Sequence, residues 1–194
     1  IRSKKGRTEM SQRDRMMLTA RKYSIGTYVN RFVAPEFQRM IRAEAGAQPD
    51  GNNVMAVVNG RLEYVYRRRG ECVCVTCGSV KPWSGGLGGM HTGHFVSSRR
   101  HSILLEEDNV APQCSSCNRY HDGMPQQFRL WMEHVRGVEV VERLEALKRT
   151  TRKFTRDELV DMRIEYKRRL KEAEIEVTSK DLVTLRQDQK RNSE

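Results

Sequence analysis

The chain has 194 residues, of which 31% are charged and 37% hydrophobic, so it is long enough for one domain with a modest core. Its formal net charge of +11 at pH 7 favours a polyanionic partner, and nucleic acid is the first candidate. No stretch approaches the roughly 18 consecutive apolar residues of a membrane span, and residues 1–7 lack the apolar core of a signal peptide. The five cysteines fit a reducing compartment better than a disulfide framework. We therefore expect a cytoplasmic protein with no membrane partner.

The N-terminal region, residues 1–71, is predicted to hold helices followed by a hairpin. Residues 1–14 are polar and basic and are predicted to form a flexible arm. From Met16 to about Ala45, apolar residues recur at helical spacing, and Pro35 divides this stretch into two helices. We expect this region to bind DNA or to form a dimer interface.

Residues 54–58 and 61–66 predict the two strands of a β-hairpin. The Asn59-Gly60 pair between them accepts the positive φ values that a tight type I′ turn requires. Three adjacent arginines follow the second strand, where they either contact phosphates or form a solvated strand end: Arg67, Arg68 and Arg69.

Two Cys-x-x-Cys pairs mark the central region, residues 72–137. A gap of two residues lets both thiolates of a turn face one ion, so two such pairs predict a tetrahedral structural zinc site. The spacer between the pairs has 36 residues, 78 to 113, which leaves room for a further site inside it. Cys72 is interpreted as a free thiol. The predicted zinc ligands are Cys74, Cys77, Cys114 and Cys117.

The spacer is predicted to be rich in loops. Its glycine-rich stretch, residues 84–89, matches neither nucleotide-binding pattern, so we expect no nucleotide cofactor. Residues 94–96 and 102–105 are predicted to pair as two short strands, and a helix is predicted to start near Ser115.

The rest of the chain is predicted to be helical, with a basic C-terminal region at residues 138–194. Pro125 predicts the start of a helix that Gly137 ends, and a second helix follows at 140–147. Thr155 and Glu158 form a capping box. The helix that it opens carries an apolar stripe and a basic face; the stripe consists of Leu159, Met162, Tyr166 and Leu170. Candidate DNA-binding residues outside the hairpin are Arg99, Arg100, Arg119, Lys153, Arg163 and Lys167.

The segment between the cysteine pairs resembles the ββα-metal, or HNH, nuclease motif. That motif has a histidine on its first strand, an asparagine in the connecting loop and a metal ligand on its helix. His94, Asn109 and Asn118 occupy these places. The resemblance implies that His94 is the general base, that Asn109 braces the loop and orients His94, and that Asn118 binds one catalytic Mg²⁺ or Mn²⁺.

One position departs from the motif. Many ββα-metal nucleases carry an aspartate directly before the base as a second metal ligand, and this chain has Gly93 there. His91 is the closest candidate and His121 its rival, since each lies three residues from a motif residue, and Asp122 is a further possible oxygen donor. An imidazole ligand would shift the preference toward Mn²⁺.

A wider set of motifs, over roughly residues 72–172, resembles the NinG (Rap) family of lambdoid phages. Its elements are the first cysteine pair, the run Gly93-His94-Phe95-Val96-Ser97, the stretch from Asn109 to Asn118, and Glu158-Leu159 with Tyr166. The resemblance implies a recombination nuclease that acts on branched DNA such as Holliday junctions or D-loops. It does not extend to residues 1–71, and the family usually has an aspartate where His91 stands.

We therefore expect a mainly helical α+β protein, in which a zinc-stapled ββα-metal core lies between N-terminal helices with a hairpin and C-terminal helices. The predicted function is a metal-dependent endodeoxyribonuclease for branched recombination intermediates. A homodimer is compatible with symmetric incision of a junction. Two alternatives stay open: an HNH nickase on linear duplex DNA, and a catalytically inactive, zinc-dependent DNA-binding accessory protein, which Gly93 would favour.

Overall fold

The protein is described by a computed structural model that covers residues 10–49, 51–84, 88–97 and 101–191, with the side chains of all these except 101–102 and 179–191. The fold is mixed α+β, as predicted, with long helices and three two-stranded antiparallel sheets among the described residues. Within the described part of the chain, none of the helices is both long and apolar enough to cross a membrane.

The N-terminal helices are α1 (Gln12–Arg21), α2 (Ile25–Tyr28) and α3 (Ala34–Ala47), with a π-helical turn (Val29–Val33) leading into α3. The prediction that Pro35 divides two helices is wrong, because helical backbone continues from Ile25 through the π-helical turn to Ala47, and the break lies at residues 22–24. Pro35 lies in the first turn of α3, directly after the π-helical turn, a position that tolerates a proline. The prediction of a flexible arm over residues 1–14 is wrong for its last residues, because α1 begins at Gln12. Residues 1–9 lie outside the described part of the chain.

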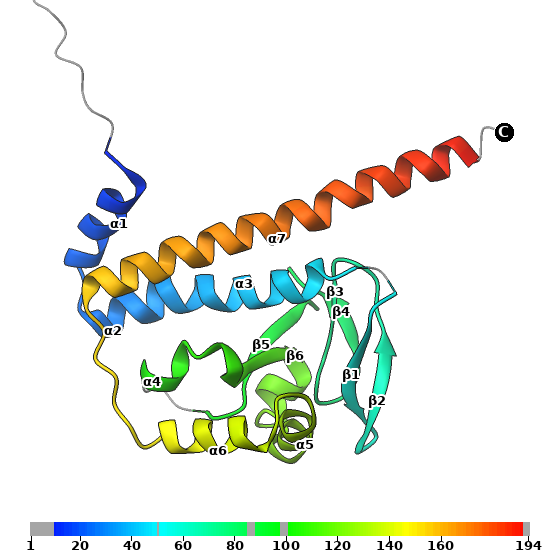
Figure 1. Ribbon diagram of the computed structural model, residues 1–194, viewed down its shortest axis with the longest axis horizontal. Helices are drawn as coiled ribbons and strands as arrows, with labels where there is room; N and C mark the ends of the chain where they lie inside the picture. The colour runs from blue at the N-terminus through cyan, green and yellow to red at the C-terminus, as the bar shows by residue number, and fades with distance from the viewer. Residues whose placement is uncertain (1–9, 50, 85–87, 98–100, 192–194) are drawn as a thin grey trace, which may run out of the picture.

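The long helix α7 (Arg156–Arg191) lies along α3, and the two form the upper layer of the molecule in Figure 1. The predicted capping box is confirmed: the Thr155 backbone N–H donates to Glu158 at 2.7 Å, and the Glu158 N–H donates to the Thr155 hydroxyl at 3.2 Å. The predicted stripe packs into the main core, where the Tyr166 ring lies 5.2 Å from that of Phe37.

The predicted hairpin is also confirmed. Strand β1 (Asn53–Val58) pairs with β2 (Arg61–Tyr66), and the turn residues Asn59 and Gly60 have φ values of 50° and 80°. The next sheet pairs β3 (Glu71–Val73) with β4 (Val80–Pro82). Val75 links the hairpin to the segment around Pro112. Its carbonyl accepts from the Val57 N–H of β1, and its N–H donates to the Pro112 carbonyl.

The third sheet pairs β5 (Met90–His94) with β6 (Val110–Cys114), so the prediction that residues 94–96 pair with 102–105 is wrong. A short helix α4 (His101–Leu104) and a 3₁₀ turn (Glu107–Asn109) occupy the connection instead. Ile103 of this short helix is fully buried in a second hydrophobic core. A helical turn can place an apolar side chain in a core as readily as a strand can, so the apolar residues alone did not distinguish the two.

The remaining helices follow the prediction more closely. A short π-helical segment (Ser116–Tyr120) stands where a helix from about Ser115 was predicted. Helices α5 (Pro125–Val135) and α6 (Val138–Leu147) come next, and Gly137 separates them with a φ of 97°. They form the lower layer in Figure 1, below β5 and β6.

Candidate functional site

The four cysteines predicted to bind zinc lie together at one end of β6. Their sulfur atoms are all within 4.8 Å of one another, and three of the four residues are buried. The Sγ atoms of Cys77 and Cys114 are 3.8 Å apart. Tetrahedral zinc with Zn–S bonds of about 2.3 Å separates its sulfurs by about 3.8 Å, whereas a disulfide needs about 2.05 Å. The donor set therefore fits one structural Zn²⁺.

The surroundings of the cluster also suit thiolate ligands. The Cys117 N–H points to the Cys114 sulfur at 3.5 Å, and the Thr76 hydroxyl lies 3.3 Å from the Cys74 sulfur. Cys72 stays outside the cluster, as predicted, and its thiol donates to the Arg42 carbonyl at 3.3 Å. Burial raises the pKa of Cys72 to about 12, so this thiol is protonated at neutral pH.

His94 is the last residue of β5, and its ring is held by a main-chain carbonyl. Its Nε2 lies 3.2 Å from the Leu104 oxygen. A carbonyl oxygen only accepts, so this nitrogen carries the proton of the neutral imidazole and the other nitrogen keeps its lone pair. Burial lowers the pKa of His94, and the bond to Leu104 opposes that shift only in part. The neutral form, which a general base requires, is therefore favoured at physiological pH.

Asn109 is fully buried and ties the loop after β5 to its own backbone. Its Oδ1 accepts from the Val96 N–H at 2.8 Å, and its Nδ2 donates to the carbonyls of Val96 and Ile103 at 3.1 and 3.2 Å. Ile103 immediately precedes Leu104, the residue that fixes the His94 ring. Asn109 thus braces the loop around His94, and its described bonds go to the main chain rather than to the imidazole.

A polar cavity of about 420 Å³ lies beside His94. It brings together three of the predicted site residues, His91, His94 and Asn118, with the predicted DNA contact Arg119. Helix α3 adds Gln38 and Arg42 to the wall, and Met90 and Thr92 of β5 complete it. Burial first, and then the charges of Arg119 and Arg42, lower the pKa of His91, so its ring is neutral and available to a metal.

His121, the rival metal ligand, is exposed just after the π-helical segment and does not line this cavity. Between the two alternatives, the structure brings His91 rather than His121 to Asn118. Apart from the four cysteines, the described residues contain no group of three or more metal-binding side chains. Of the residues predicted to bind a catalytic metal, His91 and Asn118 share this cavity.

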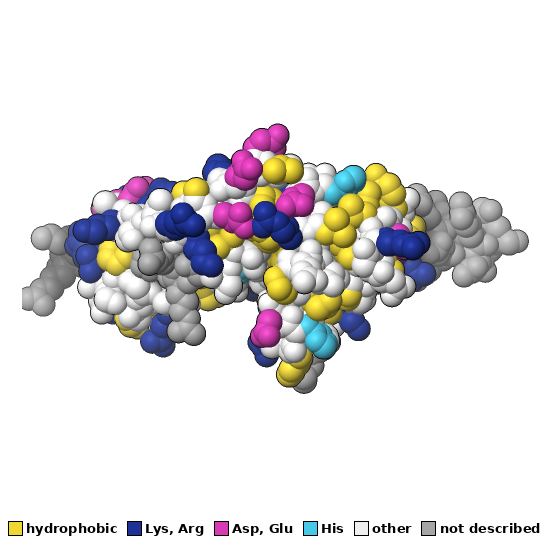
Figure 2. Space-filling view, turned by 90° about the horizontal axis from the view of Figure 1, so that it is seen from below, with side chains coloured by type: hydrophobic (Ala, Val, Ile, Leu, Met, Phe, Trp, Pro, Cys, Tyr) yellow, Lys and Arg dark blue, Asp and Glu magenta, His cyan; other side chains and the backbone are white. Residues whose placement is uncertain are grey.

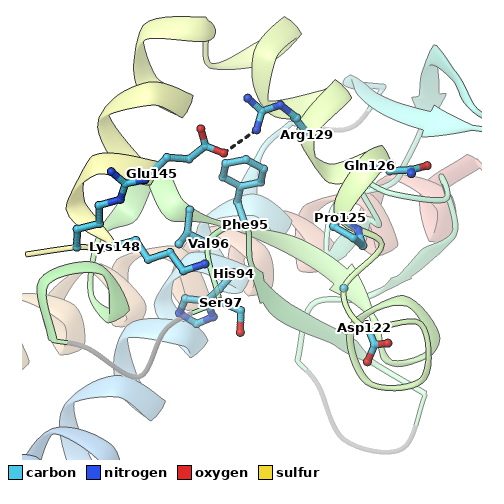
Figure 3. A pocket seen from close by; sticks show the side chains of 12 residues that line it. His94, Phe95, Val96, Ser97, Asp122, Pro125, Gln126, Arg129, Glu145 and Lys148 are labelled. Atoms are coloured by element: carbon cyan, nitrogen blue, oxygen red, sulfur yellow. Dashed lines mark hydrogen bonds and ion pairs between the residues drawn. The ribbon is translucent and has the colours of Figure 1, made fainter.

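A second and larger hollow, of about 1040 Å³, also has His94 in its wall (Figure 3). Its wall combines the start of the loop after β5 with α5 and the end of α6. We call it the groove; its lining includes Ser97, Asp122, Arg129, Glu145, Lys148 and Arg149. Arg129 is engaged there by Glu145 at 2.6 Å, whereas the Lys148 side chain extends toward His94.

Gly93 faces a wall that leaves no room for a side chain. A Cβ at this position would overlap the Gln113 carboxamide, with the Gln113 Cδ at 2.6 Å and its Cγ at 2.9 Å. Gln113 is itself fixed, because its Nε2 donates to the Thr76 hydroxyl at 3.1 Å and to the Gly123 carbonyl at 2.8 Å. The aspartate that many ββα-metal nucleases carry here would not fit.

The profile of the family described as bacteriophage lambda NinG protein matches residues 52–176. The chain belongs to the NinG family. It has no significant match among curated protein sequences or solved structures. The match with the NinG family includes both cysteine pairs, the loop braced by Asn109, and the groove. It begins at residue 52, so it includes the hairpin that the resemblance from residue 72 left out. Helix α3 lies before this start, so Gln38 and Arg42 come from a segment outside the matched residues.

Several arginines predicted to contact DNA are engaged inside the protein instead. Arg67 is only 1% exposed and donates to three backbone carbonyls, so it cannot present its charge to a surface ligand. Arg69 is nearly buried and donates to the Ala47 carbonyl. Arg163 makes a bidentate ion pair with Glu36 of α3, at 3.0 and 2.9 Å.

The other predicted DNA contacts differ in their placement. Lys167 lies 3.4 Å from the same Glu36 carboxylate. Arg68, Arg119 and Lys153 are exposed, and Arg99 and Arg100 lie outside the described residues. Figure 2, which looks onto the side of α5 and α6, shows Lys and Arg side chains spread over this face with acidic ones near its centre. No single basic surface therefore dominates this face.

The structure also reveals site residues that the sequence did not single out. Gln38 and Arg42 lie about fifty residues before the histidines and reach the cavity because α3 packs on β5, where the Thr92 hydroxyl donates to the Gln38 carbonyl at 2.8 Å. No local spacing could indicate this contact. Lys148 begins a basic stretch at the end of α6, from which Lys153 rather than Lys148 was predicted as a DNA contact.

Proposed function

We propose that this member of the NinG family is a metal-dependent endodeoxyribonuclease in which His94 is the general base. The observation that carries the proposal is the half-buried His94 ring, held by the Leu104 carbonyl at the junction of two polar hollows. An accessible ring nitrogen with a free lone pair beside a cavity lined by arginines suits the activation of water next to a phosphate.

The chain's own residues account for most of the reaction. The free nitrogen of His94 takes a proton from a water molecule as the water oxygen attacks phosphorus. The bond from phosphorus to the leaving oxygen breaks, and that oxygen takes a proton from solvent water. Arg119 and Arg42 line the cavity and would stabilise the added negative charge on the phosphate oxygens. Asn109 fixes the loop, so that the His94 ring needs no rearrangement when it reacts.

A catalytic Mg²⁺ or Mn²⁺ would be held by Asn118 and His91, and it would supply charge stabilisation at the leaving oxygen. The cavity lining contains no carboxylate and carries two arginines. Two neutral donors beside two positive charges make a weak cation site on their own. Phosphate oxygens of the substrate would therefore complete the coordination, and we expect the ion to bind together with DNA.

The proposed substrate is branched DNA of the kind formed in phage recombination, and it follows from membership of the NinG family together with the positive net charge. A dimer with two active sites would allow symmetric incision of a four-way junction. Cleavage of linear duplex by a nickase uses the same residues, and a comparison of substrates separates the two.

A second candidate function is a zinc-dependent, catalytically inactive DNA-binding protein. The lack of a carboxylate in the cavity lining and the blocked position 93 favour it. It needs the cysteine cluster and the arginines but not a free nitrogen on His94.

The test is cleavage of a labelled four-way junction, a D-loop and a linear duplex by zinc-loaded protein, with Mg²⁺ or Mn²⁺ added. We expect cuts near the branch point that are lost in His94→Ala and reduced in Asn118→Ala, at unchanged zinc content. Equal cutting of linear duplex would contradict the proposed preference for branched DNA but would leave the role of His94 as general base standing. Tight binding without cutting under either ion would favour the inactive protein.

A further inference from the structure

The cavity beside His94 holds two arginines and no counter-charge. Its lining contains Arg42 and Arg119 but no aspartate or glutamate, and neither arginine makes an ion pair with any described carboxylate. Other arginines of the described residues have a carboxylate partner, for example Arg163 with Glu36 and Arg169 with Glu44. Two like charges around one hollow repel each other, so this arrangement favours an anion between them.

Arg42 is the more informative of the two because it is partly buried. Its Nε donates to the Trp83 carbonyl at 3.3 Å and its Nη1 donates to the Thr92 hydroxyl at 3.0 Å. These neutral partners hold the guanidinium in place but do not balance its charge. Burial, reinforced by nearby Arg39, lowers the pKa of Arg42, which marks a cation in an unfavourable setting. A cation kept in such a place is most simply explained by a ligand that neutralises it.

The groove, which also has His94 in its wall, holds a further cation, the exposed Lys148, and is lined by the carboxylates of Asp122 and Glu145. Lys148 lines the groove and makes no ion pair with a described side chain, in contrast to Arg129, which Glu133 and Glu145 engage at 2.8 and 2.6 Å. In Figure 3 the Lys148 side chain extends toward His94 and Ser97. His94 lines both hollows, so it stands between Lys148 on one side and the arginine pair on the other.

We propose that one DNA strand passes over His94, with one backbone phosphate bound between Arg42 and Arg119 in the cavity and a neighbouring phosphate bound by Lys148 in the groove. This strand path rests on the proposed function and assigns it two substrate-binding residues, Arg42 and Lys148. Contacts to the backbone on both sides of His94 fix the position of the strand without regard to base sequence. Sequence-independent positioning suits an enzyme that recognises the shape of its DNA.

The strand path also gives the N-terminal helix α3 a role in binding the substrate. Arg42 belongs to α3, outside the residues that match the NinG family, and α3 is held on β5 through Thr92 and on α7 through the Glu36–Arg163 pair. The N-terminal region thus completes the phosphate site of the matched core.

The test is the salt dependence of DNA binding, measured on a labelled four-way junction without added Mg²⁺ or Mn²⁺. The plot of log K against log salt has a negative slope, and each phosphate contact that is lost reduces the magnitude of this slope by about 0.9 on duplex DNA. We expect this decrease in Arg119→Gln, Lys148→Gln and Arg42→Gln, and a slope close to the wild-type value in Arg42→Lys. The matched control is Lys81→Gln, which removes the same charge from an exposed residue of β4 that lines neither hollow.

Zinc content and circular dichroism show whether each variant is folded. If Arg42→Gln does not fold, Arg119→Gln and Lys148→Gln decide the question, because these two side chains are exposed. Unchanged slopes in both would overturn the strand path, and so would an equal decrease in the Lys81 control, which would indicate a general effect of charge.

Cleavage separates this inference from the proposed function. If wild-type protein cuts DNA in a way that depends on His94 while the slopes stay unchanged, the strand path is wrong and the nuclease stands. If the slopes fall as expected but no cutting occurs, the path stands as a binding surface and the nuclease is wrong. If both hold, Arg119→Gln and Lys148→Gln should also reduce kcat/KM by about 10- to 100-fold, the usual effect of losing a charged hydrogen bond.

Discussion

The replacement of Gly93 by alanine tests the local geometry of the site most sharply. A single methyl group at this position would overlap the Gln113 carboxamide, whose Cδ and Cγ would lie 2.6 and 2.9 Å from it. Gln113 is fully buried and can move aside only by breaking its bonds to Thr76 and Gly123. Two lost hydrogen bonds at about 1 kcal/mol each, with some overpacking, predict a destabilisation of about 2–4 kcal/mol.

The assay is urea unfolding of zinc-loaded protein, followed by circular dichroism, in which the midpoint should fall while the m-value stays constant. Gly26→Ala is the matched control. Gly26 lies in α2 and a Cβ there would meet nothing within 4 Å, so this variant should be neutral or slightly stabilised.

A double-mutant cycle identifies the cause. Gln113→Ala removes the opposing carboxamide, so Gly93→Ala should cost far less in that background, with a coupling of about 2 kcal/mol. A Gly93→Ala protein as stable as the wild type would refute the reasoning. For the same steric reason, Gly93→Asp should lower the stability of the protein without raising its activity.

Three further predictions concern the candidate zinc site, the proposed base and Arg163, a predicted DNA contact that pairs with Glu36. Replacing Cys117 by serine should abolish zinc binding and unfold the β5–β6 region, seen as lost zinc by metal analysis and a lower melting temperature; unchanged zinc content would contradict the four-cysteine site. Because burial lowers the pKa of His94 and a general base must be neutral, kcat/KM should rise with pH through a pKa below 6.5 and then level off; a rise centred above 6.5 would contradict this assignment. Arg163→Met should destabilise the α3–α7 packing by about 2 kcal/mol in urea unfolding but leave junction affinity nearly unchanged, since Glu36 already engages this arginine; a large loss of affinity in folded protein would restore Arg163 as a DNA contact.

Much of the local structure could be predicted from the sequence because short-range chemistry determines it. The spacing of the cysteines, the Asn59-Gly60 turn and the Thr155–Glu158 capping box each specify a geometry within a few residues, and each is present in the structure. Membership of the NinG family was likewise indicated by motifs that the sequence displays directly.

The errors concern long-range contacts. The partner of β5 is β6, because Asn109 closes the intervening loop on Val96 and Ile103, and no local pattern indicates this closure. Arg67 is the first of three adjacent arginines, a pattern that indicates surface charge. In the structure its side chain is buried and donates to backbone carbonyls from two separate segments. The contribution of α3 to the cavity depends on the packing of distant elements. The division into three regions stays a prediction.

The most direct test of the central claim is the single-turnover cleavage rate of His94→Ala against that of the wild type, on one four-way junction with saturating Mg²⁺ or Mn²⁺. The two proteins should carry equal zinc and bind the junction with similar affinity, since His94 is neutral and contributes no charge. We expect the variant to be slower by about 10²- to 10⁴-fold, the usual contribution of a general base. Equal rates, or wild-type protein that binds the junction without cutting it, would contradict the assignment of His94 as the base of a nuclease.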